Sequence, residues 1–166
     1  ELIESGAYGR PRMINALNFT DFLYRPRRPE ELDTTRGGGV IFSQAAHQID
    51  IVRLFGGGRV RSVRAMTGSW DTARPTEGAY SALLTFEDDT FASVTYSGYA
   101  HFDSDELTGW IGEMGLPKDR SHYGSARKAL RDASPAQEAA MKAARNFGGK
   151  AYAPHPPPAG PMLHQH

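Results

Sequence analysis

The sequence predicts an α+β domain: a largely antiparallel β-sheet with helices packed on one face. Two observations carry this prediction. Residues 78–102 hold two runs of apolar and aromatic residues on either side of the polar turn EDDT, a pattern typical of a β-hairpin. Residues 40–55 carry apolar side chains at helical spacing, so one helix stripe can cover a sheet.

The chain opens with ELIESG, which resembles the last turns of a helix that ends at Gly6. Residues 12–20 are expected to form the first strand, with Ile14 and Ala16 on one face. A loop should follow over 21–39, because its prolines prevent regular pairing.

A helix is expected over 40–55, with glycines at both ends. Its apolar stripe consists of Ile41, Ala45, Ile49 and Val52. Segment 59–70 is rich in strand formers. The hairpin strands Tyr80–Phe86 and Phe91–Tyr96 should then pair antiparallel.

The last third is less patterned. Residues 107–114 fit a short helix or a strand, and two helices are expected at SARKALRD and PAQEAAMKAARNF, the second with Pro135 at its first position. We expect one domain over 1–150 and an extended, proline-rich tail over 151–166.

Composition excludes several classes of function. Nineteen basic residues balance nineteen acidic ones among 166, so no bulk charge favours nucleic acid or an anionic membrane. No apolar run approaches the roughly 20 residues of a membrane helix. Cysteine is absent, which excludes disulfides and thiol catalysis and is compatible with a cytoplasmic location. Trp70 and Trp110 are not set in a basic stripe.

The helix at 40–55 carries a candidate acid/base site. Ser43, His47 and Asp50 share one helical face. Asp50 could accept a hydrogen bond from the imidazole and leave the other ring nitrogen for a ligand. The glycines Gly37, Gly38 and Gly39 allow a ligand or another backbone to approach the helix start. The alternatives are a structural histidine and a triglycine that only forms a loop.

This segment resembles the signature of the glucose–fructose oxidoreductase, inositol dehydrogenase and rhizopine-catabolism (Gfo/Idh/MocA) family. That signature is GGG, a few apolar residues, then Asp-x-Gly-x-His-x-x-Asp, and here Ser43, Ala45, His47 and Asp50 match it. The resemblance covers residues 1–99. It implies a C-terminal substrate domain whose N-terminal Rossmann partner binds NAD or NADP.

The resemblance also implies roles for particular residues. His47 would be catalytic and hold the reacting hydroxyl or take its proton; Ser43 stands where most members have an aspartate. Substrate-binding roles are expected for Ser43, Gln44, Arg25, Arg27, Arg28 and Asn18. Supporting roles are expected for Asp50, Gly37, Gly38 and Gly39.

The arginine-rich stretch YRPRRPEE suits carboxylate binding, and with the glycine motif it resembles the branch that oxidises 4,5-dihydroxy-4,5-dihydrophthalate. The alternative is a solvated loop whose arginines pair with Glu30 and Glu31. The sequence has no GxGxxG after a strand and no Glu-Lys-Pro motif. We therefore expect a fragment of a longer protein, inactive alone, with cofactor binding mostly outside it.

The resemblance further implies homo-oligomers formed through the open face of the sheet. The expected contact residues are Tyr80, Leu84, Thr85, Thr95 and Tyr96. A non-catalytic binding or oligomerisation module with the same fold is the alternative. No metal site is expected, because His155, His164 and His166 lie in proline-rich surroundings without rigid geometry.

Overall fold

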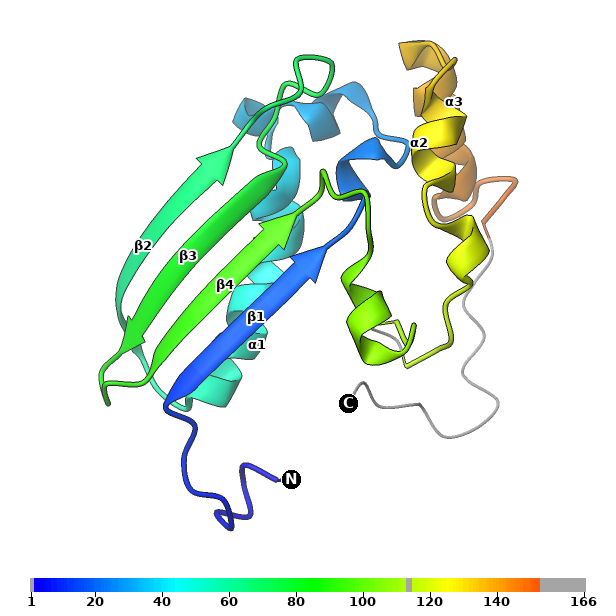
Figure 1. Cartoon of the computed structure of the whole chain (residues 1–166). Helices are drawn as coiled ribbons and strands as arrows, with labels where there is room; N and C mark the ends of the chain where they lie inside the picture. The colour runs from blue at the N-terminus through cyan, green and yellow to red at the C-terminus, as the bar shows by residue number, and fades with distance from the viewer. Residues whose placement is uncertain (1, 113–114, 153–166) are drawn as a thin grey trace.

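A computed structural model describes residues 2–112 and 115–152. Its centre is a four-stranded sheet of β1 (Met13–Phe19), β2 (Val60–Gly68), β3 (Ala79–Phe86) and β4 (Phe91–Ser97) (Figure 1). All four strands lie where the sequence predicts strands, and the α+β class is confirmed.

The strand order is β1-β4-β3-β2. Strands β2, β3 and β4 pair antiparallel, as the hairpin pattern predicts. β1 instead pairs parallel with β4, from Met13 opposite Phe91 to Phe19 opposite Ser97. The first strand therefore forms one edge of the sheet beside the last strand.

The predicted helix at 40–55 consists of two parts. A π-helix, η4 (Ile41–Ala45), leads into α1 (Ala46–Gly56). The Ser43 hydroxyl donates to the Gly39 carbonyl at 2.6 Å, a bond that competes with regular helical pairing in the first turn. α1 packs on β1 and β4 with Val52 buried, and burial of such a side chain stabilises by about 1.5–3 kcal/mol.

The glycine run before α1 is packed against Glu77, a buried residue just before β3. The Glu77 carboxylate accepts from the Thr34 hydroxyl and from the backbone N–H of Ile41, the latter at 3.4 Å. Gly39 has a φ of 84°, and a Cβ there would collide with this carboxylate. Because Gly39 has no Cβ, the Glu77 side chain of the same chain can approach the start of the helix.

The core lies between α1 and the sheet. Strands β3 and β4 alternate, so that every second side chain faces α1. Tyr80, Leu84 and Tyr96 are buried on this face. Their predicted role as contacts on the open face is wrong, because they lie on the opposite side; Thr85 and Thr95 do lie on the open face.

The remaining elements lie beside the sheet, where α2 (Ser125–Leu130) and α3 (Pro135–Arg145) stand together on one side, beyond the end of β1 (Figure 1). Both helices match the prediction, and Ser134 caps α3 with Pro135 at its first position. Near 107–114 the chain forms a 3₁₀ helix, η5 (Ser104–Thr108), followed by a bridge between Ile111 and Pro117.

The loop at 21–39 contains three short 3₁₀ helices, η1 (Phe22–Tyr24), η2 (Pro29–Leu32) and η3 (Thr34–Arg36). At the N-terminus, residues 2–5 form a turn that closes where the Gly6 N–H bonds the Ile3 carbonyl at 3.2 Å. Within the described part of the chain, no helix is long and apolar enough to cross a membrane. The predicted tail beyond residue 152, with its three histidines, lies outside the described residues.

Candidate functional site

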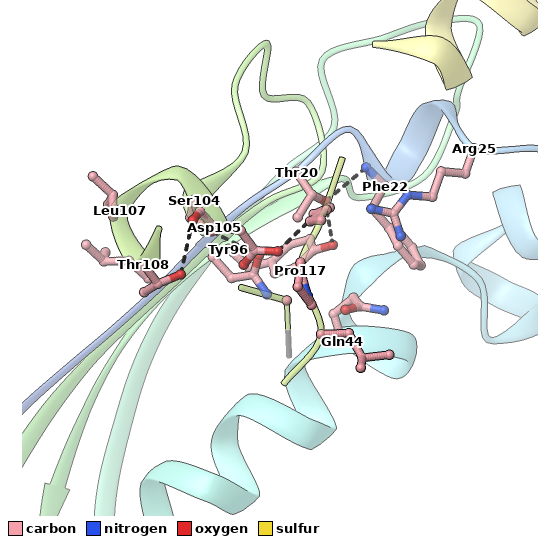
Figure 2. Close-up of a pocket in the computed structure, with 15 residues that line it drawn as sticks. Thr20, Phe22, Arg25, Gln44, Tyr96, Ser104, Asp105, Leu107, Thr108 and Pro117 are labelled. Carbon is pink, nitrogen blue, oxygen red and sulfur yellow. Dashed lines mark hydrogen bonds and ion pairs between the residues drawn. The ribbon is translucent and has the colours of Figure 1, made fainter. Parts of the chain in front are cut away.

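A cleft of about 650 Å³ lies where the end of β1, the start of the helix and the segment 104–118 meet (Figure 2). β1 contributes Asn18, the π-helix contributes Gln44, and the loop after β1 contributes Arg25. These three residues were predicted to bind substrate, and the structure brings them together from three separate elements.

Local structure explains each position. Asn18 stands one residue before the end of β1, and its Oδ1 lies 3.5 Å from the Ser104 hydroxyl. Gln44 lies in the π turn and lines the cleft from the helix start, below Phe22 and Arg25 in Figure 2. The Nε of Arg25 pairs with buried Asp21 at 3.3 Å, and this bond orients the guanidinium.

The other two predicted arginines lie elsewhere. The Arg27 guanidinium stacks on the Phe22 ring at 3.6 Å and donates to the Phe22 carbonyl at 2.9 Å. Burial lowers the pKa of Arg27, because the charged form is poorly solvated there. Arg28 is exposed and pairs with Glu30 and Glu31. Neither arginine lines the cleft. Arg28 lies as the alternative interpretation predicted, in a solvated loop where it pairs with glutamates.

The predicted helix motif is divided in space. His47 is exposed on the first turn of α1, three residues after Gln44, and is not among the residues that line the cleft. Asp50 pairs with Arg53 at 2.9 Å, so the expected bond between Asp50 and His47 does not form. The Ser43 hydroxyl is bound to the Gly39 carbonyl.

The floor of the cleft is a set of hydrogen-bonded side chains. Buried Tyr96 pairs its hydroxyl with that of Thr20 at 3.2 Å, and both residues line the cleft. The Tyr80 ring stacks on Tyr96 with centroids 6.0 Å apart, and its hydroxyl donates to Gln48. Burial raises the pKa of Tyr80, so this hydroxyl stays protonated and acts as a donor.

No sequence pattern predicts the wall of the cleft that the segment 104–118 forms. Ser104, Asp105, Thr108 and Lys118 line it, and they come from a segment without clear periodicity. The only local signal was DSD, in which Asp103 caps η5 by accepting from the Asp105 N–H at 3.0 Å. Such a cap predicts a helix start and not a binding wall.

No group of three or more histidine, aspartate or glutamate side chains among the described residues could hold a metal ion. A dinucleotide phosphate does not fit at the glycine run, because the Glu77 carboxylate already occupies the space beside Gly39 and would repel it. The start of the helix after Gly39, as the described residues form it, is therefore not a phosphate-binding site.

A mixed sheet covered on one face by α1, with a polar cleft at the helix start, defines an α+β domain. The family model for the GFO/IDH/MocA C-terminal domain matches residues 1–115, which is over half of the chain. The chain belongs to this family, which confirms the resemblance found in the sequence.

Similar proteins include dehydrogenases and oxidoreductases. The chain is 49% identical to the 1-carboxy-3-chloro-3,4-dihydroxycyclohexa-1,5-diene dehydrogenase of Comamonas testosteroni over 167 residues, which is all of this chain and 42% of that protein. It thus spans about two fifths of this relative's length.

Solved structures agree on the fold. A protein from Bordetella bronchiseptica RB50 that is assigned as a dehydrogenase matches with a TM-score of 0.82 and 51% identity, over 89% of this chain and 39% of that one. A protein from Thermotoga maritima assigned as an oxidoreductase matches with a TM-score of 0.51 and 25% identity, over 61% of this chain and 31% of that one.

Proposed function

We propose that this chain is the substrate-binding and oligomerisation domain of an NAD(P)-dependent dehydrogenase that removes hydride from a hydroxyl-bearing carbon. The observation that carries the proposal is the cleft, which gathers Asn18, Arg25 and Gln44 at the start of the motif helix. An amide pair and one guanidinium suit a small substrate that bears hydroxyl and carboxylate groups.

The substrate class is supported by the relatives. The name of the Comamonas testosteroni protein describes a ring with one carboxyl and two hydroxyl groups. A cis-dihydrodiol dicarboxylate such as 4,5-dihydroxy-4,5-dihydrophthalate is the finer candidate that the arginine-rich loop suggests. Loss of hydride from one carbinol carbon of 4,5-dihydroxy-4,5-dihydrophthalate and of a proton from its hydroxyl gives a ketone, which tautomerises to an aromatic catechol.

His47 is the residue we propose for proton transfer. His47 is exposed on the first turn of α1. It follows the π-helix whose residue Gln44 lines the cleft. An imidazole can accept a proton near neutral pH. Ser43 cannot serve as a carboxylate base, and its hydroxyl is bound to the backbone. The proton of the reacting hydroxyl is therefore assigned to His47.

The cofactor would be held mainly by an N-terminal Rossmann domain of the same protein. NAD or NADP supplies the acceptor for the hydride when bound.

Exposed apolar side chains on η4 and α1 support a contact surface for this Rossmann domain, since soluble proteins rarely leave a large apolar patch exposed to solvent. They are Phe42, Ile51, Leu54 and Phe55. We expect the chain alone to be inactive.

Replacing His47 with alanine tests the proposal. In the full-length protein, His47→Ala should lower kcat by roughly 10²–10⁴-fold, the usual effect of losing a general acid/base group. Steady-state kinetics with a dihydrodiol carboxylate substrate measures this. Arg53→Ala, an exposed change on the same helix, is the control and should change kcat little. Near-normal turnover of His47→Ala would remove this residue from the chemistry.

A further inference from the structure

Asp105 and Lys118 form one wall of the cleft, which has no role in the family motif, and Lys118 lies beyond the matched residues 1–115. The Lys118 ammonium donates to Asp103, which is 2% exposed, and to Asp105 Oδ2 at 3.0 Å. Asp105 and Lys118 line the cleft, whereas Asp103 lies behind them.

Charge decides what this wall can bind. Burial alone would lower the pKa of Lys118, but its hydrogen bonds to Asp103 and Asp105 outweigh burial and raise the pKa. Lys118 is thus an ammonium shared by two carboxylates, and the three side chains together carry one net negative charge. This wall repels a substrate carboxylate and favours groups that donate hydrogen bonds.

Asp105 has one oxygen available for such donors. Its Oδ2 accepts from Lys118, and its Oδ1 has no hydrogen-bond donor among residues 2–112 and 115–152. The backbone fixes the residue, because its carbonyl accepts from the Trp110 N–H at 2.7 Å and from the Thr108 hydroxyl at 3.1 Å. The cleft therefore presents a pre-oriented carboxylate oxygen as an acceptor.

The loop arginines supply only one cation to the cleft. Arg27 is stacked on Phe22 and Arg28 is paired with Glu30 and Glu31. Arg25 lines the cleft and uses only its Nε for Asp21, so its two terminal nitrogens bond no other described residue. One guanidinium end can hold one carboxylate in a bidentate pair.

We propose that Asp105, held by Lys118, is a specificity-determining residue that accepts hydrogen bonds from substrate hydroxyl groups while Arg25 binds a carboxylate. The cleft then selects a hydroxylated ring with one carboxylate over a ring with two. This inference rests on the proposed function, and it narrows the substrate of the same site.

Equilibrium binding to the full-length protein tests it with three stable aromatic probes: benzoate, 3,4-dihydroxybenzoate and 4,5-dihydroxyphthalate. The wild-type protein should bind 3,4-dihydroxybenzoate about 10-fold or more tightly than benzoate, the scale of one hydrogen bond to a charged group. The dicarboxylate should bind more weakly than 3,4-dihydroxybenzoate. Calorimetry measures all three without any turnover.

Asp105→Asn keeps the shape and removes the charge. It should abolish most of the preference for the dihydroxy probe and relieve the penalty on the dicarboxylate, while benzoate binds as before. Asp105→Ser, which also removes the charge, should give the same pattern. Glu106→Gln is the matched control, because Glu106 is exposed on the same 3₁₀ helix and does not line the cleft. Arg25→Ala should weaken all three probes alike.

Three results would overturn the inference: tighter wild-type binding of the dicarboxylate, an unchanged preference in Asp105→Asn, or no binding of any probe at millimolar concentration. The proposed function fails in a different way. If the binding pattern is as expected but no dihydrodiol acid is oxidised by the full-length protein, the dehydrogenase assignment is wrong and the selectivity of the cleft stands.

Discussion

Gly39 shows how one residue position determines the geometry of the site. It adopts a left-handed conformation, and its missing Cβ leaves space for the Glu77 carboxylate beside the helix start. That carboxylate and the Glu77 carbonyl bind the backbone N–H groups of Ile41 and Val40. The first turn of the motif helix, and with it Gln44, is therefore held by this contact.

Substitution of Gly39 should be far more damaging than substitution of Gly37. Gly37 is also left-handed, but a Cβ there meets no atom within 4 Å. Gly37→Ala should cost about 1 kcal/mol for the backbone conformation alone. Gly39→Ala adds the collision with Glu77 and should cost about 3 kcal/mol or more. Chemical denaturation of both variants measures this, and equal losses would contradict the packing role.

Three of the residues predicted to bind substrate lie together, whereas Arg27 and Arg28 do not join them. Asn18, Arg25 and Gln44 do line one cleft. Arg27 was indistinguishable from Arg25 in the sequence, because only the folded loop shows that Arg27 stacks on Phe22. The partners of an arginine depend on contacts between distant segments, and no local pattern encodes them.

At the scale of elements, periodicity predicted the hairpin and α1 well, since each depends on local alternation or a local stripe. The parallel pairing of β1 with β4 was not predicted, because register between strands far apart in the chain has no local signature. The π turn at Ile41–Ala45 was missed for a similar reason: it depends on bonds to Gly39 and Glu77.

Helix α3 is held by ion pairs more than by apolar packing. Glu138, 13% exposed at its side chain, accepts from the Arg74 Nη1 at 2.6 Å and from the Arg27 N–H at 2.8 Å. Lys142, one turn later, pairs with Glu31 at 3.4 Å. The helix is thus fastened to the arginine-rich loop that borders the cleft.

Glu138→Gln should loosen α3, because it leaves the buried Arg74 charge without its partner. A loss of about 3 kcal/mol is expected for a broken buried pair, and amide hydrogen exchange should rise in α3 before it rises in the sheet. Lys142→Gln is the control on the same helix; its pair with Glu31 is more exposed and should contribute less than about 1 kcal/mol. Equal effects of the two changes would contradict the role of Glu138.

Within residues 2–112 and 115–152, the sheet has one covered and one uncovered face. The uncovered face carries apolar side chains from all four strands, and most of them are well exposed. They are Met13, Leu17, Met66, Leu83 and Phe91. An exposed apolar sheet face is typical of a protein interface, and this supports our proposal that copies of the protein associate through it.

Leu83→Asp should disrupt that association. It places a charge at the middle of the uncovered face, and the dissociation constant should rise about 100-fold or more, given roughly 1.5–3 kcal/mol for a buried leucine and the added charge. Light scattering after size exclusion measures the mass. Val63→Asp is the control, because Val63 is similarly exposed but faces the α1 side, opposite Leu84. A wild-type mass equal to one chain would contradict the proposal.

The parallel pairing at the sheet edge sets an order of assembly during synthesis. Met13 leaves the ribosome well before its neighbour Phe91, since 77 residues separate them, and closing such a long loop slows folding. During synthesis β1 therefore has no strand to pair with until the hairpin of β3 and β4 has left the ribosome. Only then can Asn18 reach the site, so the cleft is complete for a ligand only when about residue 118 has left the ribosome.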